Sequence, residues 1–168
     1  LGPQGVAILN ADDPLVAAMA SRCAGAVVTF GHHHEADLRL GPVDLDDVGR
    51  PQFSMTWGEE TKEISMKLLG AHQALNAGAV AATALACGSS LQSCASALQS
   101  VTALSRWRME LAERADGLAV INDAYNANPE SMAAAIETLT AIGGRCGRRT
   151  IAVLGEMLEL GESSQQSH

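Results

Sequence analysis

Residues 6–14 read VAILNADDP, and this run sets the fold class. Its four leading apolar residues indicate a buried strand, and the polar residues after them indicate a turn. Asp12 or Asp13 can cap a helix that has Pro14 in its first turn and continues through residues 15–24. A second apolar run at 26–30 completes a strand, helix, strand unit, which predicts two parallel strands.

The same order returns at residues 118–129, which read LAVINDAYNANP. An apolar strand at 118–121 again ends in Asn and Asp, and we expect a helix from Pro129 to Ile142 and a strand at 151–154. Ligands of open α/β sheets bind at the carboxyl ends of strands, because the loops there gather polar groups around helix N-termini. Both repeats therefore place candidate binding groups at that edge.

The residues between the two repeats have a different pattern, which predicts antiparallel strands followed by helices. Apolar and polar residues alternate at 53–57 and 62–66, on either side of a Gly-Glu-Glu turn, which predicts a hairpin in an antiparallel flap at about 36–67. Helices are expected at 71–87 and 90–104. We expect an α/β fold with a domain boundary near residue 105 and a parallel sheet on each side of it.

Composition excludes several classes of protein. Of the 168 residues, 47% are apolar, which excludes a disordered tail. The formal net charge of −8, without any basic run, disfavours a nucleic-acid or anionic-membrane partner. No apolar run approaches the roughly 20 residues of a membrane span, and no signal layout opens the chain, so we expect a cytoplasmic protein. Four cysteines without a CxxC pair are expected to be reduced: Cys23, Cys87, Cys94 and Cys146.

The loop Asn122–Pro129 is the most unusual segment, because eight residues hold one carboxylate, one phenol and three amides. Such a loop suits a polar ligand. The alternative is a helix-capping turn with Pro129 at the first helical position. That alternative explains Asn128 and Pro129 and leaves the other polar groups without a role.

Other candidates are weaker. Arg106 and Arg108 either clamp a phosphate or lie solvated at a domain junction. His72 and Asn76, four residues apart, share one helix face where a base or phosphate can dock, although a satisfied helix-start histidine has the same appearance. Three consecutive histidines at 32–34 diverge from one another, so we expect a solvated loop and no metal site.

Two further observations concern catalysis. Glu156 follows the expected strand at 151–154 and is either a metal or amine ligand or part of a capped helix. The chain contains neither a GxxxxGK[ST] phosphate loop nor a Ser, His, Asp array, so no catalytic residue is assigned within it.

The chain resembles the ATP-dependent Mur ligases over nearly its whole length, in the segments NADDP, LLGAHQALNAGAVAATALA, RWRMEL, VINDAYNANPESMAAAIETL and IAVLGEMLELGESSQQSH. The pairing of NDAYNANP with GEMLELG is similar to the branch that joins D-alanyl-D-alanine to UDP-N-acetylmuramoyl-tripeptide in peptidoglycan synthesis. The resemblance implies that ATP phosphorylates the tripeptide carboxylate and that the dipeptide amine attacks the acyl phosphate. Mg²⁺ and cationic side chains then neutralise the developing charge.

The resemblance also implies a domain organisation. Residues 1–104 would be the C-terminal half of the central ATP-binding domain, and 105–168 the start of a Rossmann-like C-terminal ligase domain. The phosphate loop and the Mg²⁺ ligands would lie upstream of Leu1, so we expect the chain alone to be inactive, and a monomer is favoured. Closure of the two domains on ATP would complete the site.

Site residues follow from the same resemblance. It assigns His72 and Asn76 to the adenine pocket, Arg108 to the nucleotide phosphates and Asp123 to the ribose. It assigns Tyr125, Asn126 and Asn128 to the dipeptide acceptor side. Gln73 stands where the family has Asn, which leaves the adenine contact there open.

Two alternatives to this function stay open. One is a sibling ligase, including folylpolyglutamate synthase, that adds an amino acid or glutamate. The other is a non-catalytic nucleotide-binding or partner-binding module. The sequence does not decide whether the tripeptide carries diaminopimelate or lysine.

Overall fold

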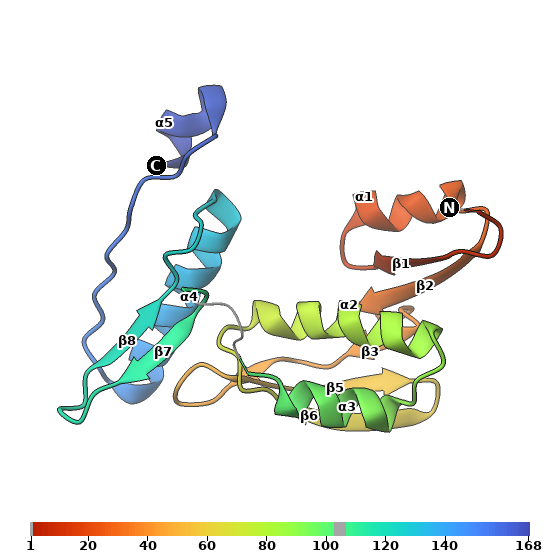
Figure 1. Cartoon of the computed structure of the whole chain (residues 1–168), viewed down its shortest axis with the longest axis horizontal. Coiled ribbons are helices and arrows are strands. Elements are labelled where there is room, and N and C mark those ends of the chain that lie inside the picture. Colours follow the sequence, from red (N-terminus) through yellow and green to blue (C-terminus); the bar gives the residue numbers. More distant parts are fainter. Residues whose placement is uncertain (1, 103–106) are drawn as a thin grey trace.

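The chain forms two parts in the computed structural model, which describes residues 2–102 and 107–168. Figure 1 shows the first part as helices α1 to α3 with strands β1 to β3, β5 and β6, and the second as α4 and α5 with strands β7 and β8. The boundary expected near residue 105 lies outside the described residues, as does Arg106. No helix within the described ranges is both long and apolar enough to cross a membrane.

The strand, helix, strand unit at the start of the chain is confirmed. Strands β1 (Val6–Asn10) and β2 (Ala26–Gly31) pair in parallel, with Ile8 opposite Val28. The helix expected over 15–24 is wrong in extent, since α1 covers Pro14–Ala17 and a 3₁₀ helix continues over Ala18–Arg22. Neither helix buries a residue, and packing supplies most of the stability of a short α-helix.

The predicted flap is confirmed, and it continues the parallel strands in one sheet. Strand β3 (Leu38–Leu40) is parallel to β2, while β4 (Asp44–Leu45), β5 (Pro51–Trp57) and β6 (Glu60–Ser65) are antiparallel additions. The order of the sheet is β1-β2-β3-β5-β4, with β6 on β5. The hairpin register pairs Phe53 with Ile64, whose side chains are both buried.

Two helices cover this sheet and form the core with it. Helix α2 spans His72–Ala86 as predicted, and α3 spans Leu91–Ser100, so the helix expected to continue to residue 104 ends earlier. Small residues of α2 are buried, which lets its backbone lie close to the sheet. Fully buried Leu38, Met55, Ile64 and Leu91 join the two layers. Cys23, Cys87 and Cys94 are free thiols, as predicted.

The second part differs from the prediction. Strand β8 (Ala119–Asn122) follows the expected run, but it pairs antiparallel with β7 (Glu110–Glu113), so the parallel sheet expected here is wrong. A turn at 114–118 joins the two strands, and so short a link permits only an antiparallel pair.

The strand expected at 151–154 is also wrong. These residues have no strand partner among those described, and Val153 is 93% exposed. An apolar run becomes a strand only where a neighbour takes its backbone hydrogen bonds. Helix α4 (Pro129–Cys146) is longer than predicted, and a 3₁₀ helix (Gly161–Ser163) and α5 (Ser164–Ser167) close the chain.

Candidate functional site

Side-chain hydrogen bonds link the polar residues in the first turn of α2. Asn76 Nδ2 donates to Gln73 Oε1 at 3.3 Å, and Gln73 Nε2 lies 3.1 Å from His72 Nε2. An amide NH₂ group only donates, so His72 Nε2 accepts and the ring carries its proton on Nδ1. The Gln73 amide thereby orders both His72 and Asn76, the two residues predicted to share this face.

The backbone before α2 lies close to the ring of His72. Gly70 has φ +98°, and a Cβ built there would lie 2.5 Å from His72 Cε1, so only glycine lets the ring pack this closely. Burial lowers the pKa of His72 below its usual 6.5, while the Asp123 carboxylate acts in the opposite direction. The neutral ring is favoured, in agreement with its role as acceptor from Gln73.

The loop after β8 holds the segment 107–109 in an unusual conformation. Asp123 Oδ1 accepts a hydrogen bond from Met109 N at 3.0 Å, and Tyr125 N donates to Trp107 O at 3.1 Å. Trp107 and Met109 have φ values of 63° and 47°, which non-glycine residues adopt only when their surroundings hold them there. These two bonds connect the loop to Arg108, which lies between the two strained residues.

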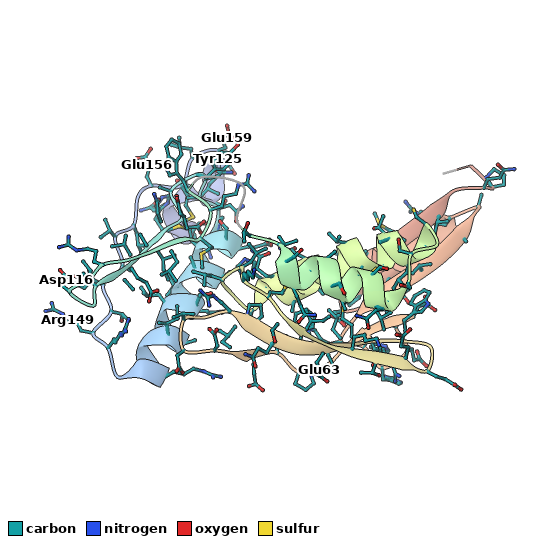
Figure 2. The ribbon with its side chains drawn as sticks, turned by 60° about the horizontal axis from the view of Figure 1, so that its bottom comes forward. Glu63, Asp116, Tyr125, Arg149, Glu156 and Glu159 are labelled. Atoms are coloured by element: carbon teal, nitrogen blue, oxygen red, sulfur yellow. The ribbon has the colours of Figure 1, made fainter. Side chains whose placement is uncertain are left out.

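Arg108 stacks on the aromatic ring of the same loop. Its guanidinium carbon lies 4.3 Å from the centroid of the Tyr125 ring, a cation–π contact. Figure 2 shows Tyr125 at the same end of the β7–β8 hairpin as Glu156 and Glu159, and opposite Asp116. The structure thus brings together Arg108, Asp123 and Tyr125, and the electrostatic effect of Asp123 on His72 connects them to α2.

The last two residues of the predicted acceptor set are engaged within their own loop. Asn126 Oδ1 accepts from Ala127 N at 2.9 Å. Asn128 caps α4, because its Oδ1 accepts from Ser131 N at 2.8 Å and its backbone N donates to Ser131 Oγ at 3.1 Å. The capping alternative for Asn128 and Pro129 is therefore confirmed.

A cleft of about 570 Å³ lies where the start of α2 and the flap meet β7 and the residues before it. Gln73 and Met109 both line this cleft. Three cations and three leucines line it as well: Arg50, Lys67, Arg108, Leu68, Leu69 and Leu111. Its volume falls in the range of small-molecule sites, and its mixture of apolar wall and charge suits a nucleotide.

Sequence reasoning missed Arg50 and Lys67. A usable signal was present in the hairpin, since the register that pairs Gln52 with Ser65, continued outward, brings these two cations opposite each other. Met66 N donates to Pro51 O at 3.0 Å, which extends the pairing toward them.

The first repeat serves a structural purpose. Asp13, and not Asp12, caps α1, accepting from Leu15 N at 2.8 Å. Asp12 accepts from the backbone N of His32 and His33 at 2.9 and 2.8 Å, and so holds the histidine loop. Across the described ranges no three His, Cys, Asp or Glu side chains gather to hold a metal ion, so no Mg²⁺ ligand is assigned there.

Comparison with known proteins identifies relatives of both parts. The model of the Mur ligase middle domain matches residues 1–84, and that of the Mur ligase, glutamate ligase domain matches 107–168. The chain is 45% identical over 166 residues to UDP-N-acetylmuramoyl-tripeptide–D-alanyl-D-alanine ligase of Mycobacterium tuberculosis (strain ATCC 25618 / H37Rv), covering 98% of this chain and 32% of that protein. The chain thus spans about a third of that relative's length.

Solved structures of MurF have the same fold as this chain. A crystal structure of MurF from Acinetobacter baumannii superposes with a TM-score of 0.84 at 28% identity, covering 98% of this chain and 35% of the other. MurF ligase from Thermotoga maritima, in complex with ADP, has the same fold with a TM-score of 0.76 at 21% identity, covering 99% and 36% of the two chains.

Proposed function

The chain belongs to the Mur ligase family, and we propose that it supplies the nucleotide-binding junction of the ligase that joins D-alanyl-D-alanine to UDP-N-acetylmuramoyl-tripeptide at the expense of ATP. The observation that carries the proposal is the cleft, which is lined both by Gln73, from the start of α2, and by Arg108 of the second part. We divide the protein as 1–104 and 105–168, the central ATP-binding and C-terminal ligase domains. Identity to the mycobacterial relative supports the choice of branch.

Each polar group near the cleft has a task in this proposal. His72 and Asn76 face the adenine, with Gln73 holding both in place. Asp123 uses Oδ1 for Met109 N, which leaves Oδ2 as acceptor for a ribose hydroxyl. Arg108, kept in position by Tyr125, donates to the phosphates.

The reaction is the transfer of the γ-phosphoryl group of ATP to the tripeptide carboxylate, which releases ADP. The dipeptide amine then attacks the acyl phosphate, which forms the amide bond and releases inorganic phosphate. A carboxylate and a phosphate repel each other, so cations must offset the charge that develops between them. Arg108 does this from the second part. Mg²⁺ belongs to the proposed reaction, and none of the described residues is assigned to it.

The acceptor dipeptide is placed at the loop after β8. Tyr125 is 58% exposed there, and Asn126 lies beside it. Asn128 contributes through the cap that fixes this loop on α4. We further propose a monomer that acts in the cytoplasm, where ATP is supplied.

A segment exchange tests the activity. The part of the M. tuberculosis ligase matched by this chain is replaced with residues 1–168, and ADP release is measured with UDP-N-acetylmuramoyl-tripeptide and different acceptors. Release that requires D-alanyl-D-alanine is expected. Release with a single amino acid instead would indicate a sibling ligase, and no release despite nucleotide binding would indicate a non-catalytic module.

Asp123 provides the sharpest single test of the nucleotide assignment. Asp123→Ala should weaken ADP binding roughly tenfold to hundredfold, because a hydrogen bond to a charged acceptor is lost. Asp123→Asn keeps an acceptor for Met109 N, so its ADP affinity should lie between those of the unaltered chain and Asp123→Ala. Asp116→Ala is the matched control, since this carboxylate pairs with Arg114 at 2.9 Å at the far end of the hairpin. Unchanged affinity in Asp123→Ala, measured by calorimetry, would refute the ribose assignment.

A further inference from the structure

The side chain of Arg50 contains a buried donor without an acceptor. Among side-chain nitrogen and oxygen atoms of the described residues, Arg50 Nε is the buried one that lacks a hydrogen-bond partner. Buried polar groups are almost always paired, because leaving one unpaired forfeits its interaction with water. The exception belongs to a residue that lines the cleft.

One carboxylate on the same turn, that of Asp46, is already engaged by the backbone. Asp46 Oδ1 accepts from Arg50 N at 2.8 Å and from Val48 N at 3.0 Å, and Asp46 N donates to Arg50 O at 2.9 Å. These bonds fix the backbone of Arg50 just before β5. Arg50 therefore starts from a hydrogen-bonded turn, and one oxygen of the Asp46 carboxylate is used by the backbone.

Positive charge collects on this side of the cleft. Arg50, Lys67 and Arg108 line it, and none of them forms an ion pair within the described ranges. The two carboxylates of the lining are Glu110 and Glu113, and Glu110 Oε2 accepts from Trp107 N at 3.3 Å. The lining thus holds three cations and two carboxylates, a small positive excess in a chain of net charge −8, which favours an anionic ligand.

We propose that Arg50 is a phosphate-binding residue, through which the antiparallel flap contacts the nucleotide. Its Nε–H and a terminal N–H form the two-pronged donor that matches two oxygens of one phosphate group. Lys67, opposite it at the base of the hairpin, and Arg108, from the second part, add positive charge. The proposal rests on the nucleotide function and extends the site to the flap, which the resemblance did not include.

Nuclear magnetic resonance tests this contact directly. The Nε–Hε signal of Arg50 in the ¹⁵N-labelled 168-residue chain, identified by its loss in Arg50→Lys, is followed during four titrations. ADP and pyrophosphate should shift it, while adenosine and D-alanyl-D-alanine should not. A shift with D-alanyl-D-alanine would overturn the phosphate assignment in favour of a carboxylate, and no shift with any probe would overturn the site.

Affinity measurements separate this proposal from the function on which it rests. Arg50→Gln should weaken ADP binding about tenfold and leave adenosine binding unchanged. The ADP affinity of Arg50→Lys should lie between those of Arg50→Gln and the unaltered chain. Arg39→Gln removes the same charge from an exposed position on β3 and should have no effect. Equal ADP affinity in Arg50→Gln and the unaltered chain would overturn the role of Arg50 alone. A response to pyrophosphate without any binding of ADP or adenosine would support the anion site and refute the nucleotide function.

Discussion

The tautomer of His72 is the most sensitive chemical feature of the site. The ring accepts from Gln73 only while Nε2 is unprotonated, and its Cε1 packs closely against Gly70. Gln at position 73 is thus more than a longer replacement for Asn, because its reach lets one amide contact both His72 and Asn76.

Acid should weaken the fold through His72. Because burial lowers its pKa below 6.5 in the folded state, the unfolded chain binds the proton more readily. The contribution of the neutral ring is complete above pH 6.5 and is lost as the pH falls through 6.5 toward the lower folded value. His72→Gln removes this dependence, so the free energy of unfolding of the unaltered chain, measured in urea relative to the variant, should decline from pH 7.5 to pH 5. A constant difference between the two proteins would contradict the prediction.

Asn128 caps the N-terminus of helix α4. Its reciprocal hydrogen bonds with Ser131 form a capping box, and Pro129 follows at the first helical position. Asn128→Ala should lower the free energy of unfolding by about 1 kcal/mol, and Asn128→Ser should restore most of it. Asn126→Ala is the control, because Asn126 bonds only to the adjacent Ala127 N. Equal stability of all three variants in urea would show that the cap contributes nothing.

How well each helix or strand could be predicted depended on how much its formation relies on contacts with other elements. Helix α4 was predictable because its cap, its proline and its periodicity lie within the helix itself. The run at 151–154 has the composition of a strand but finds no partner among the described residues, and α1 is short and buries no residue. Strand β7 was missed although Asp116 and Gly117, in the turn at 114–118 that joins it to β8, form a pair typical of hairpin turns.

The two parts meet through a close contact between the flap and α4. Gly70 N donates to Gly49 O at 2.8 Å, and a Cβ built on Gly49 would lie 2.8 Å from Ile142 Cδ1. Thr138, which is 3% exposed, lies beside the same glycine. The ion pair between Arg145 and Asp44 at 3.8 Å is exposed and contributes little. The apolar contact at Gly49 therefore holds the flap against α4 one residue before Arg50, which lines the cleft.

Enlarging this glycine should alter nucleotide binding as well as stability. Gly49→Ala places a methyl group against Ile142 at φ +86° and should push α4 from the flap. Gly58→Ala is the control, because it has φ +59° and no atom within 4 Å of the added carbon. Both should lose about 1 kcal/mol of stability through backbone strain, and only Gly49→Ala should also weaken ADP binding. Equal ADP affinity in the two variants would show that this contact does not shape the cleft.

Sequence alone was sufficient for whatever depends on neighbours along the chain. The opening βαβ unit, the hairpin, the capped helix α4 and the family resemblance all follow from patterns a few residues long, because hydrophobic periodicity, turns and caps act locally. Tertiary structure decided which polar groups meet. Asp123 contacts Met109, Arg108 lies on Tyr125, and Arg50 joins Lys67 and Arg108 at one cleft, although these residues come from separate segments. Such contacts arise only when distant elements pack, and no local pattern encodes their distance or the donor they leave unpaired.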